Sequence, residues 1–140
     1  MKWQDSQQYF LADGSLRDLI IRDIDESNWN RFLVEVHELN IELSFFHGGK
    51  VISLPATYSA IIKLQESDPT TLSMNIGAGV IVNCHFFIEE ELEFDIDPKQ
   101  IKCDATYNSL LEFIRRLKVI FERDVLLTEE GDSDAILIQF

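Results

Sequence analysis

Residues 80–97 constrain the fold more than any other part of the chain. Apolar and polar side chains alternate along them with the two-residue period of a β-strand, so one face is predicted to cover a core and the other to face solvent. Eighteen residues of straight strand would span ~59 Å, whereas a globule of this size measures ~37 Å across. We therefore predict that the segment bends sharply or reverses near residues 88–90, as one strongly bent strand or as two strands.

The two faces of this segment differ in charge. The even-numbered positions are apolar except for Glu90, and the odd-numbered positions change from polar to acidic along the segment. The acids on the odd-numbered face are predicted to form a negative stripe, and they are Glu89, Glu91, Glu93, Asp95 and Asp97. Such like charges repel unless cations or water compensate them, and Arg115, Arg116 and Lys118 are the expected compensators.

The remaining pattern alternates short strands with single helices. Hairpins are expected around Asp13-Gly14, residues 47–50 and residues 129–134, and helices are expected to begin near Asp25 and Thr57. The strongest helix, residues 104–123, and the helix after Asp25 carry apolar stripes that should share one core: Trp29, Phe32, Leu33 and Val36, with Leu110, Ile114, Leu117 and Phe121. We predict an α+β fold, with a largely antiparallel sheet built from hairpins and about three helices packed mainly on one face. No linker or repeat divides the chain, so residues 1–140 are expected to form one domain.

The charge of the chain limits its partners. Aspartate and glutamate total 25 against 12 lysines and arginines, which gives a formal net charge of −13. Nucleic acids and anionic membranes are bound by cationic side chains, so neither is an expected partner. No apolar run has the length of a membrane span, and the first residues do not open a signal peptide. A cytoplasmic protein is expected.

Recognisable catalytic and cofactor motifs are missing. The sequence contains no G-x-S-x-G, H-E-x-x-H or S-x-x-K motif, and the glycines of residues 77–79 precede a strand rather than a helix. Cys84 is expected in the core, and it forms no C-x-x-C pair with Cys103. We therefore expect no cofactor, and catalytic residues stay unknown apart from the weak candidate His85, whose pKa a neighbouring carboxylate would raise.

Metal-ligating residues are scattered. The three histidines are not paired at the spacings of one strand or one helix, so no zinc site is expected. Residues 23–34 begin like an EF-hand loop, but Asn28 replaces its glycine and Val34 its final glutamate, which makes Asp25 a helix cap instead. The acidic loop at residues 129–134 is expected to bind calcium weakly at most.

Two functions fit these features. The first is a small interaction module whose acidic face binds a basic protein, as an adaptor does. In size, acidity and α+β pattern the chain also resembles small bacterial immunity proteins that block a toxin, a likeness of bulk character that no motif carries. The alternative is a small-ligand-binding or hydrolytic domain with a pocket at Asn83, His85 and Phe87, in which His85 is a base oriented by Glu89 or Glu91. An enzyme is the less favoured of the two.

Overall fold

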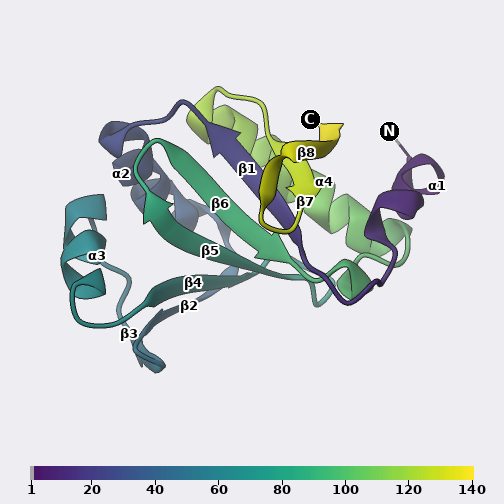
Figure 1. Ribbon diagram of the computed structural model, residues 1–140. Coiled ribbons are helices and arrows are strands. Elements are labelled where there is room, and N and C mark those ends of the chain that lie inside the picture. Colours follow the sequence, from purple (N-terminus) through teal and green to yellow (C-terminus); the bar gives the residue numbers. More distant parts are fainter. Residues whose placement is uncertain (1) are drawn as a thin grey trace.

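The computed structural model describes residues 2–140 and has eight strands in one antiparallel sheet (Figure 1). The strands lie in the order β3-β2-β4-β5-β6-β1-β7-β8. Their bounds are β1 (Arg17–Arg22), β2 (Glu42–His47), β3 (Lys50–Ile52), β4 (Thr70–Asn75), β5 (Ile81–Ile88), β6 (Glu91–Ile96), β7 (Leu126–Glu129) and β8 (Asp132–Gln139). The helices are α1 (Trp3–Ser6), α2 (Glu26–Glu35), α3 (Tyr58–Gln65) and α4 (Asp104–Phe121), with short 3-10 turns η1 (Gln7–Phe10), η2 (Val36–Leu39) and η3 (Pro98–Gln100). The predicted α+β class is confirmed.

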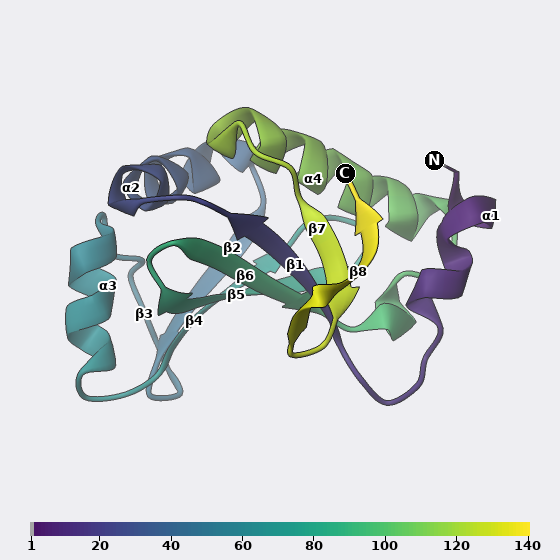
Figure 2. The same cartoon turned by 45° about the horizontal axis from the view of Figure 1, so that its top comes forward.

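Helices α2 and α4 cover one face of the sheet (Figure 2). The Phe94 ring of β6 lies with its centroid 6.0 Å from that of Phe32 on α2 and 5.5 Å from that of Phe113 on α4. The predicted core is confirmed, because every residue of the two apolar stripes is at most 2% exposed: Trp29, Phe32, Leu33, Val36, Leu110, Ile114, Leu117 and Phe121. Burial of both stripes against the sheet supplies the main hydrophobic stabilisation of the fold.

Helix α2 begins at a capping box. The Asp25 side chain accepts a hydrogen bond from the backbone N–H of Asn28 at 3.0 Å, and the Asn28 side chain accepts one from the backbone N–H of Asp25 at 3.0 Å. Both residues thereby satisfy backbone donors that the first helical turn leaves free. Asp25 is thus a helix cap, as expected.

Residues 80–97 take the second of the two forms left open by the sequence: they reverse and form the hairpin of β5 and β6. In this hairpin Asn83 lies opposite Asp95 and His85 lies opposite Glu93, while the register shifts between His85 and Ile88. The turn is fastened to α2, because the indole N–H of Trp29 donates to the carbonyl of Glu89 at 2.7 Å. The register shift is a bulge, which turns the end of β5 and re-aims its side chains.

The predicted N-terminal hairpin is wrong, because Tyr9 and Phe10, expected in its first strand, belong to the 3-10 turn η1 instead. The buried Arg17 guanidinium donates to the backbone carbonyls of Tyr9 at 2.9 Å and Leu11 at 3.2 Å. These carbonyls are therefore satisfied by a side chain, and no partner strand is required. Trp3 also packs on Tyr107 of α4, with ring centroids 5.6 Å apart. Asp13-Gly14 does form a bend, with Gly14 at a φ of 87° and the Asp13 carboxylate accepting from the backbone N–H of Ser15 at 3.0 Å, but no strand precedes it.

The hairpin of β7 and β8 curls toward the sheet face that α2 and α4 leave uncovered (Figures 1 and 2). Two residues of β1 on that face, Asp18 and Ile20, are only 5% and 0% exposed. The backbone N–H of Gly131, in the turn between β7 and β8, donates to the Asp18 carboxylate at 2.9 Å. The rest of the uncovered face stays open beside this hairpin. Among residues 2–140, no helix is both long and apolar enough to cross a membrane.

Candidate functional site: the acidic face

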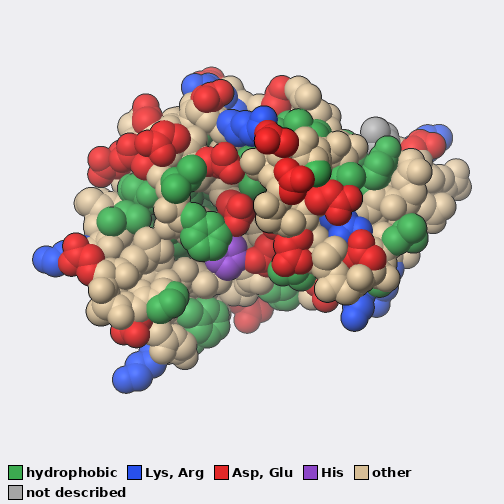
Figure 3. Space-filling model, in the orientation of Figure 1, with side chains coloured by type: hydrophobic (Ala, Val, Ile, Leu, Met, Phe, Trp, Pro, Cys, Tyr) green, Lys and Arg blue, Asp and Glu red, His purple; other side chains and the backbone are tan. Residues whose placement is uncertain are grey.

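Charged side chains of three neighbouring strands gather on the uncovered side of the sheet. We call this surface the acidic face and define it by Asp18 of β1, His85 of β5, and Glu91, Glu93 and Asp95 of β6. They share one side because register partners point the same way: Asp18 lies opposite Asp95, and His85 lies opposite Glu93. Figure 3 shows acidic side chains around a histidine on this side of the molecule.

His85 is held by a carboxylate. Its Nε2 forms an ion pair with Asp95, and Asp95 also accepts a hydrogen bond from the Asn83 side chain at 3.1 Å. The side chains of His85 and Asp95 are only 21% and 16% exposed. The hydrogen bond with Asp95 raises the pKa of His85 above its ordinary value, although burial acts in the opposite direction. His85 therefore holds its proton more strongly than a solvated histidine does.

The two other carboxylates beside this pair have perturbed acidity. Burial raises the pKa of Asp18, and the nearby charge of Asp95 raises it further, while the hydrogen bond from Gly131 lowers it. Burial likewise raises the pKa of Glu93, with an added contribution from the charge of Asp18. The ionised forms of Asp18 and Glu93 are therefore only partly stabilised by the groups around them.

Two exposed apolar side chains lie beside the charged groups. The Phe87 ring stacks on the His85 ring, with centroids 5.1 Å apart and an angle of 6° between the planes. Phe87 is nevertheless 68% exposed, and the adjacent Ile88 is 51% exposed and lies opposite Glu91. The bulge in β5 accounts for this placement, because it interrupts the alternation that would otherwise bury one of these two neighbours.

The predicted acids occupy three different settings. Glu91, Glu93 and Asp95 lie along β6 on the acidic face, and all three are partly buried. Glu89 is exposed in the turn that joins β5 to β6. Asp97 follows β6, and its carboxylate caps η3 by accepting from the backbone N–H of Lys99 at 3.0 Å. The structure therefore brings together Glu91, Glu93 and Asp95 of the predicted stripe, whereas Asp97 caps a 3-10 turn.

The expected compensating cations lie elsewhere. Arg115 and Arg116 belong to α4, which packs on the opposite side of the sheet, and both pair with Glu112 of the same helix. On the acidic face the basic side chains are instead His85, paired with Asp95, and Arg22 of β1, which lies opposite Glu91. The pairing of β1 with β6 adds Asp18, which the sequence did not single out, because nothing in a single sequence tells which distant strand lies beside β6.

At the alternative pocket, Asn83 and His85 are partly buried and Phe87 is exposed. Asn83 binds Asp95, and the partner that orients His85 is Asp95 rather than Glu89 or Glu91. Phe87 packs flat on His85 and does not form a separate aromatic wall. Within residues 2–140, no three or more His, Cys, Asp or Glu side chains are grouped to hold a metal ion. The arrangement can retain a proton on His85 and attract cations.

A scan against protein-family models, a search of curated proteins and a search of solved structures each found no match to this chain. Function is therefore inferred from the geometry and the charge of the molecule.

Proposed function

We propose that the acidic face binds a basic surface of a protein partner. The observation that carries the proposal is a set of carboxylates left without cationic partners beside exposed apolar side chains. Within the described chain, the partly buried Glu91 and Glu93 form no ion pair with a lysine or an arginine. Arg22 lies opposite Glu91, but its guanidinium pairs with Asp134 at 3.7 Å. Lysines or arginines of a partner would supply the missing countercharge.

The composition of the face supports a protein partner in particular. Phe87 and Ile88 offer an apolar centre that a partner would remove from water, and aromatic residues surrounded by polar groups are frequent energetic centres of protein interfaces. The carboxylates around them would accelerate encounter with a cationic surface and would make association depend on salt. A backbone held in a sheet also keeps these groups in place before binding, which lowers the entropic cost of association.

The proposal extends to the class of partner and to the compartment. An adaptor or an immunity-type inhibitor that neutralises a basic protein would use such a face. Nucleic acid is not the proposed partner, because a net charge of −13 repels phosphates. We place this function in the cytoplasm, where cysteines such as the free Cys84 and Cys103 stay reduced.

Charge reversal at Glu89, which is exposed in the turn beside the acidic face, and at Glu91, which is partly buried on the face, tests the proposal. Glu89→Lys combined with Glu91→Lys alters the face and spares Asp95, whose ion pair with His85 a substitution would break. Glu38→Lys combined with Glu66→Lys changes the net charge equally at exposed sites in η2 and after α3. The immobilised protein would capture partners from a cytosolic extract, and the association rate of each purified partner would be measured at increasing salt.

We expect the face variant to slow association by roughly tenfold or more and to flatten its salt dependence. The control variant should change both quantities much less, because its charges lie away from the face. Equal effects of the two variants would show that only net charge matters and would contradict the proposal. Capture that persists in molar salt would instead indicate an apolar interface elsewhere.

The His85–Asp95 pair favours a second candidate, acid–base chemistry on a small ligand at Asn83, His85 and Phe87. In the described chain Nδ1 of His85 has no hydrogen-bond partner, so it is free to exchange a proton with a ligand. A panel of chromogenic esters and phosphoesters, assayed with the wild type and with His85→Ala, tests this candidate. Turnover that His85→Ala abolishes would support it, and turnover that survives the substitution would exclude His85 as the base.

A further inference from the structure

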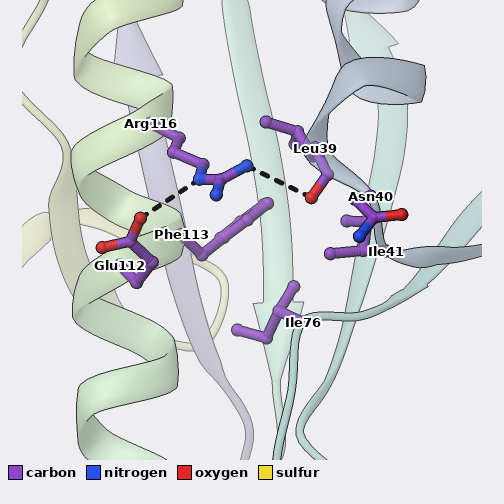
Figure 4. A pocket seen from close by; sticks show the side chains of 7 residues that line it. All are labelled: Leu39, Asn40, Ile41, Ile76, Glu112, Phe113 and Arg116. Carbon is purple, nitrogen blue, oxygen red and sulfur yellow. Dashed lines mark hydrogen bonds and ion pairs between the residues drawn. The ribbon is translucent and has the colours of Figure 1, made fainter.

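A separate cavity of about 250 Å³ opens between α4, the end of η2 and the residue after β4 (Figure 4). Its lining is formed by Leu39, Asn40, Ile41, Ile76, Glu112, Phe113 and Arg116. None of these residues belongs to the acidic face. The cavity lies on the side of the sheet that carries α4, so it is independent of the function proposed above.

The cavity has an apolar floor. Leu39 and Ile76 are each 9% exposed, Phe113 is 3% exposed, and Ile41 is partly buried. A hydrocarbon group that entered would displace water from these side chains, which is favourable. The volume is also sufficient, because a protein cavity of roughly 150 Å³ accommodates benzene. A single ring or a short alkyl chain therefore matches the space.

One cationic side chain borders this floor. The Arg116 Nε donates to the Glu112 carboxylate at 3.2 Å, and Nη1 donates to the backbone carbonyl of Leu39 at 3.1 Å. Among the described residues, Nη2 has no hydrogen-bond acceptor. Figure 4 shows the guanidinium held between its two partners, with the remaining nitrogen turned toward the side of Phe113. The fixed orientation means that little further entropy would be lost on binding a ligand there.

The local charge favours an anion. Glu112 is shared by Arg115 and Arg116, so two guanidinium charges face one carboxylate. Hydrogen bonds from both arginines lower the pKa of Glu112 and keep it ionised. One positive charge remains uncompensated within this group, in a chain whose net charge is −13. A planar guanidinium with free N–H groups is well suited to a carboxylate.

We propose that this cavity binds a small monocarboxylic acid with an apolar ring or chain. The hydrocarbon part lies on Leu39, Ile76 and Phe113, and the carboxylate accepts hydrogen bonds from the free N–H groups of Arg116. The site requires both an apolar group and a carboxylate. A bare anion would lack the apolar contacts, and a neutral hydrocarbon would lack the charge-assisted hydrogen bonds to Arg116.

Titration with phenylacetate, followed by amide NMR of the full chain, tests this inference. We expect saturable shifts at Asn40, Ile76 and Phe113. Phenylacetamide has nearly the same shape but no charge, so its affinity should be lower by roughly tenfold or more. Arg116→Gln should weaken phenylacetate binding by a similar factor.

Two further variants serve as controls. Arg115→Gln removes the surplus positive charge around Glu112, but Arg115 is outside the cavity and donates no hydrogen bond to the ligand, so binding should weaken only a few-fold and clearly less than in Arg116→Gln. Ile41→Trp fills the cavity and keeps Arg116, so it should abolish phenylacetate binding. This variant tests the site even if Arg116→Gln fails to fold. Shifts that do not saturate or map elsewhere, equal binding of phenylacetamide, or equal losses in Arg115→Gln and Arg116→Gln would overturn the inference.

Discussion

His85 on β5 pairs diagonally with Asp95 on β6, although the residue directly opposite His85 is Glu93. Asp95 lies opposite Asn83 and binds the side chains of both β5 residues. Glu93 thereby has no hydrogen bond from His85, although it lies directly beside the His85–Asp95 pair. This relationship determines how the acidic face responds to protons.

Stability should fall as pH rises above neutrality, in part because of His85. The folded protein raises the pKa of His85, so folding favours the protonated ring. That stabilisation is fully present below the ordinary histidine pKa of about 6.5 and is lost as pH rises through the higher folded value. Urea unfolding at about pH 6 and about pH 8.5 should show a smaller loss in His85→Gln than in the wild type. His37→Gln, at an exposed site in η2, is the control, and an unchanged loss in His85→Gln would refute the assignment.

Asp95→Asn should lower the pKa of His85. The substitution keeps the shape of the side chain but removes the negative charge that stabilises the imidazolium. Titration of the His85 ring by NMR measures the value directly in both proteins. The predicted direction follows because the hydrogen bond with Asp95 is the largest cause of the raised value. An equal or higher pKa in Asp95→Asn would show that Glu93 and Asp18 hold the proton instead.

Two adjacent phenylalanines should differ strongly in their effect on stability. Phe86 is 0% exposed and contacts Trp29 and Phe45, whereas Phe87 is 68% exposed. Phe86→Ala should cost ~3 to 5 kcal/mol of unfolding free energy through lost burial and a cavity. Phe87→Ala should cost less than ~1 kcal/mol, because little of its ring leaves water on folding. Chemical denaturation measures both, and similar costs would contradict the position of the bulge.

Ile114→Ala should cost ~2 to 5 kcal/mol, because Ile114 is 2% exposed in the middle of the buried stripe of α4. Val119→Ala on the same helix is the matched control, since Val119 is 65% exposed. Its effect should stay within ~0.5 kcal/mol. A cost for Ile114→Ala that is as small as that of the control would mean that α4 is not docked on the sheet.

Removal of metal ions should leave the melting temperature nearly unchanged. The described residues contain no group of three or more metal-ligating side chains, and the acidic turns are expected to bind calcium only weakly. Thermal unfolding with and without a chelator is the measurement. A fall of more than a few degrees would reveal ligands that converge from distant segments on a metal.

The parts of the fold that follow local rules could be predicted from the sequence. The parity of residues 80–97 identifies the apolar face and the acidic one, and the length of the segment requires a sharp bend or a reversal. The spacing of Trp29, Phe32 and Leu33 identifies the buried side of α2. These features depend on periods of a few residues, which a single chain displays directly.

The parts that depend on long-range pairing could not be predicted in this way. β1 lies beside β6, which brings Asp18 next to Asp95 across more than seventy positions of sequence. The cavity at Arg116 likewise combines residues of η2 and α4. The buried Arg17 side chain donates to a backbone carbonyl of the N-terminal segment, where the sequence predicted a paired strand. Periodicity contains no information on which segments become neighbours, so these contacts follow only from the three-dimensional arrangement.

The sheet does not close, so β3 and β8 each leave a row of backbone groups open to pairing with another chain. β3 has only three residues and offers a short template. β8 is longer, but its register with β7 shifts twice. Its first three residues include two acids, Asp132 and Asp134. Edge-to-edge addition of a second copy at β8 would bring like charges together along an irregular strand, which disfavours growth of the sheet into fibrils.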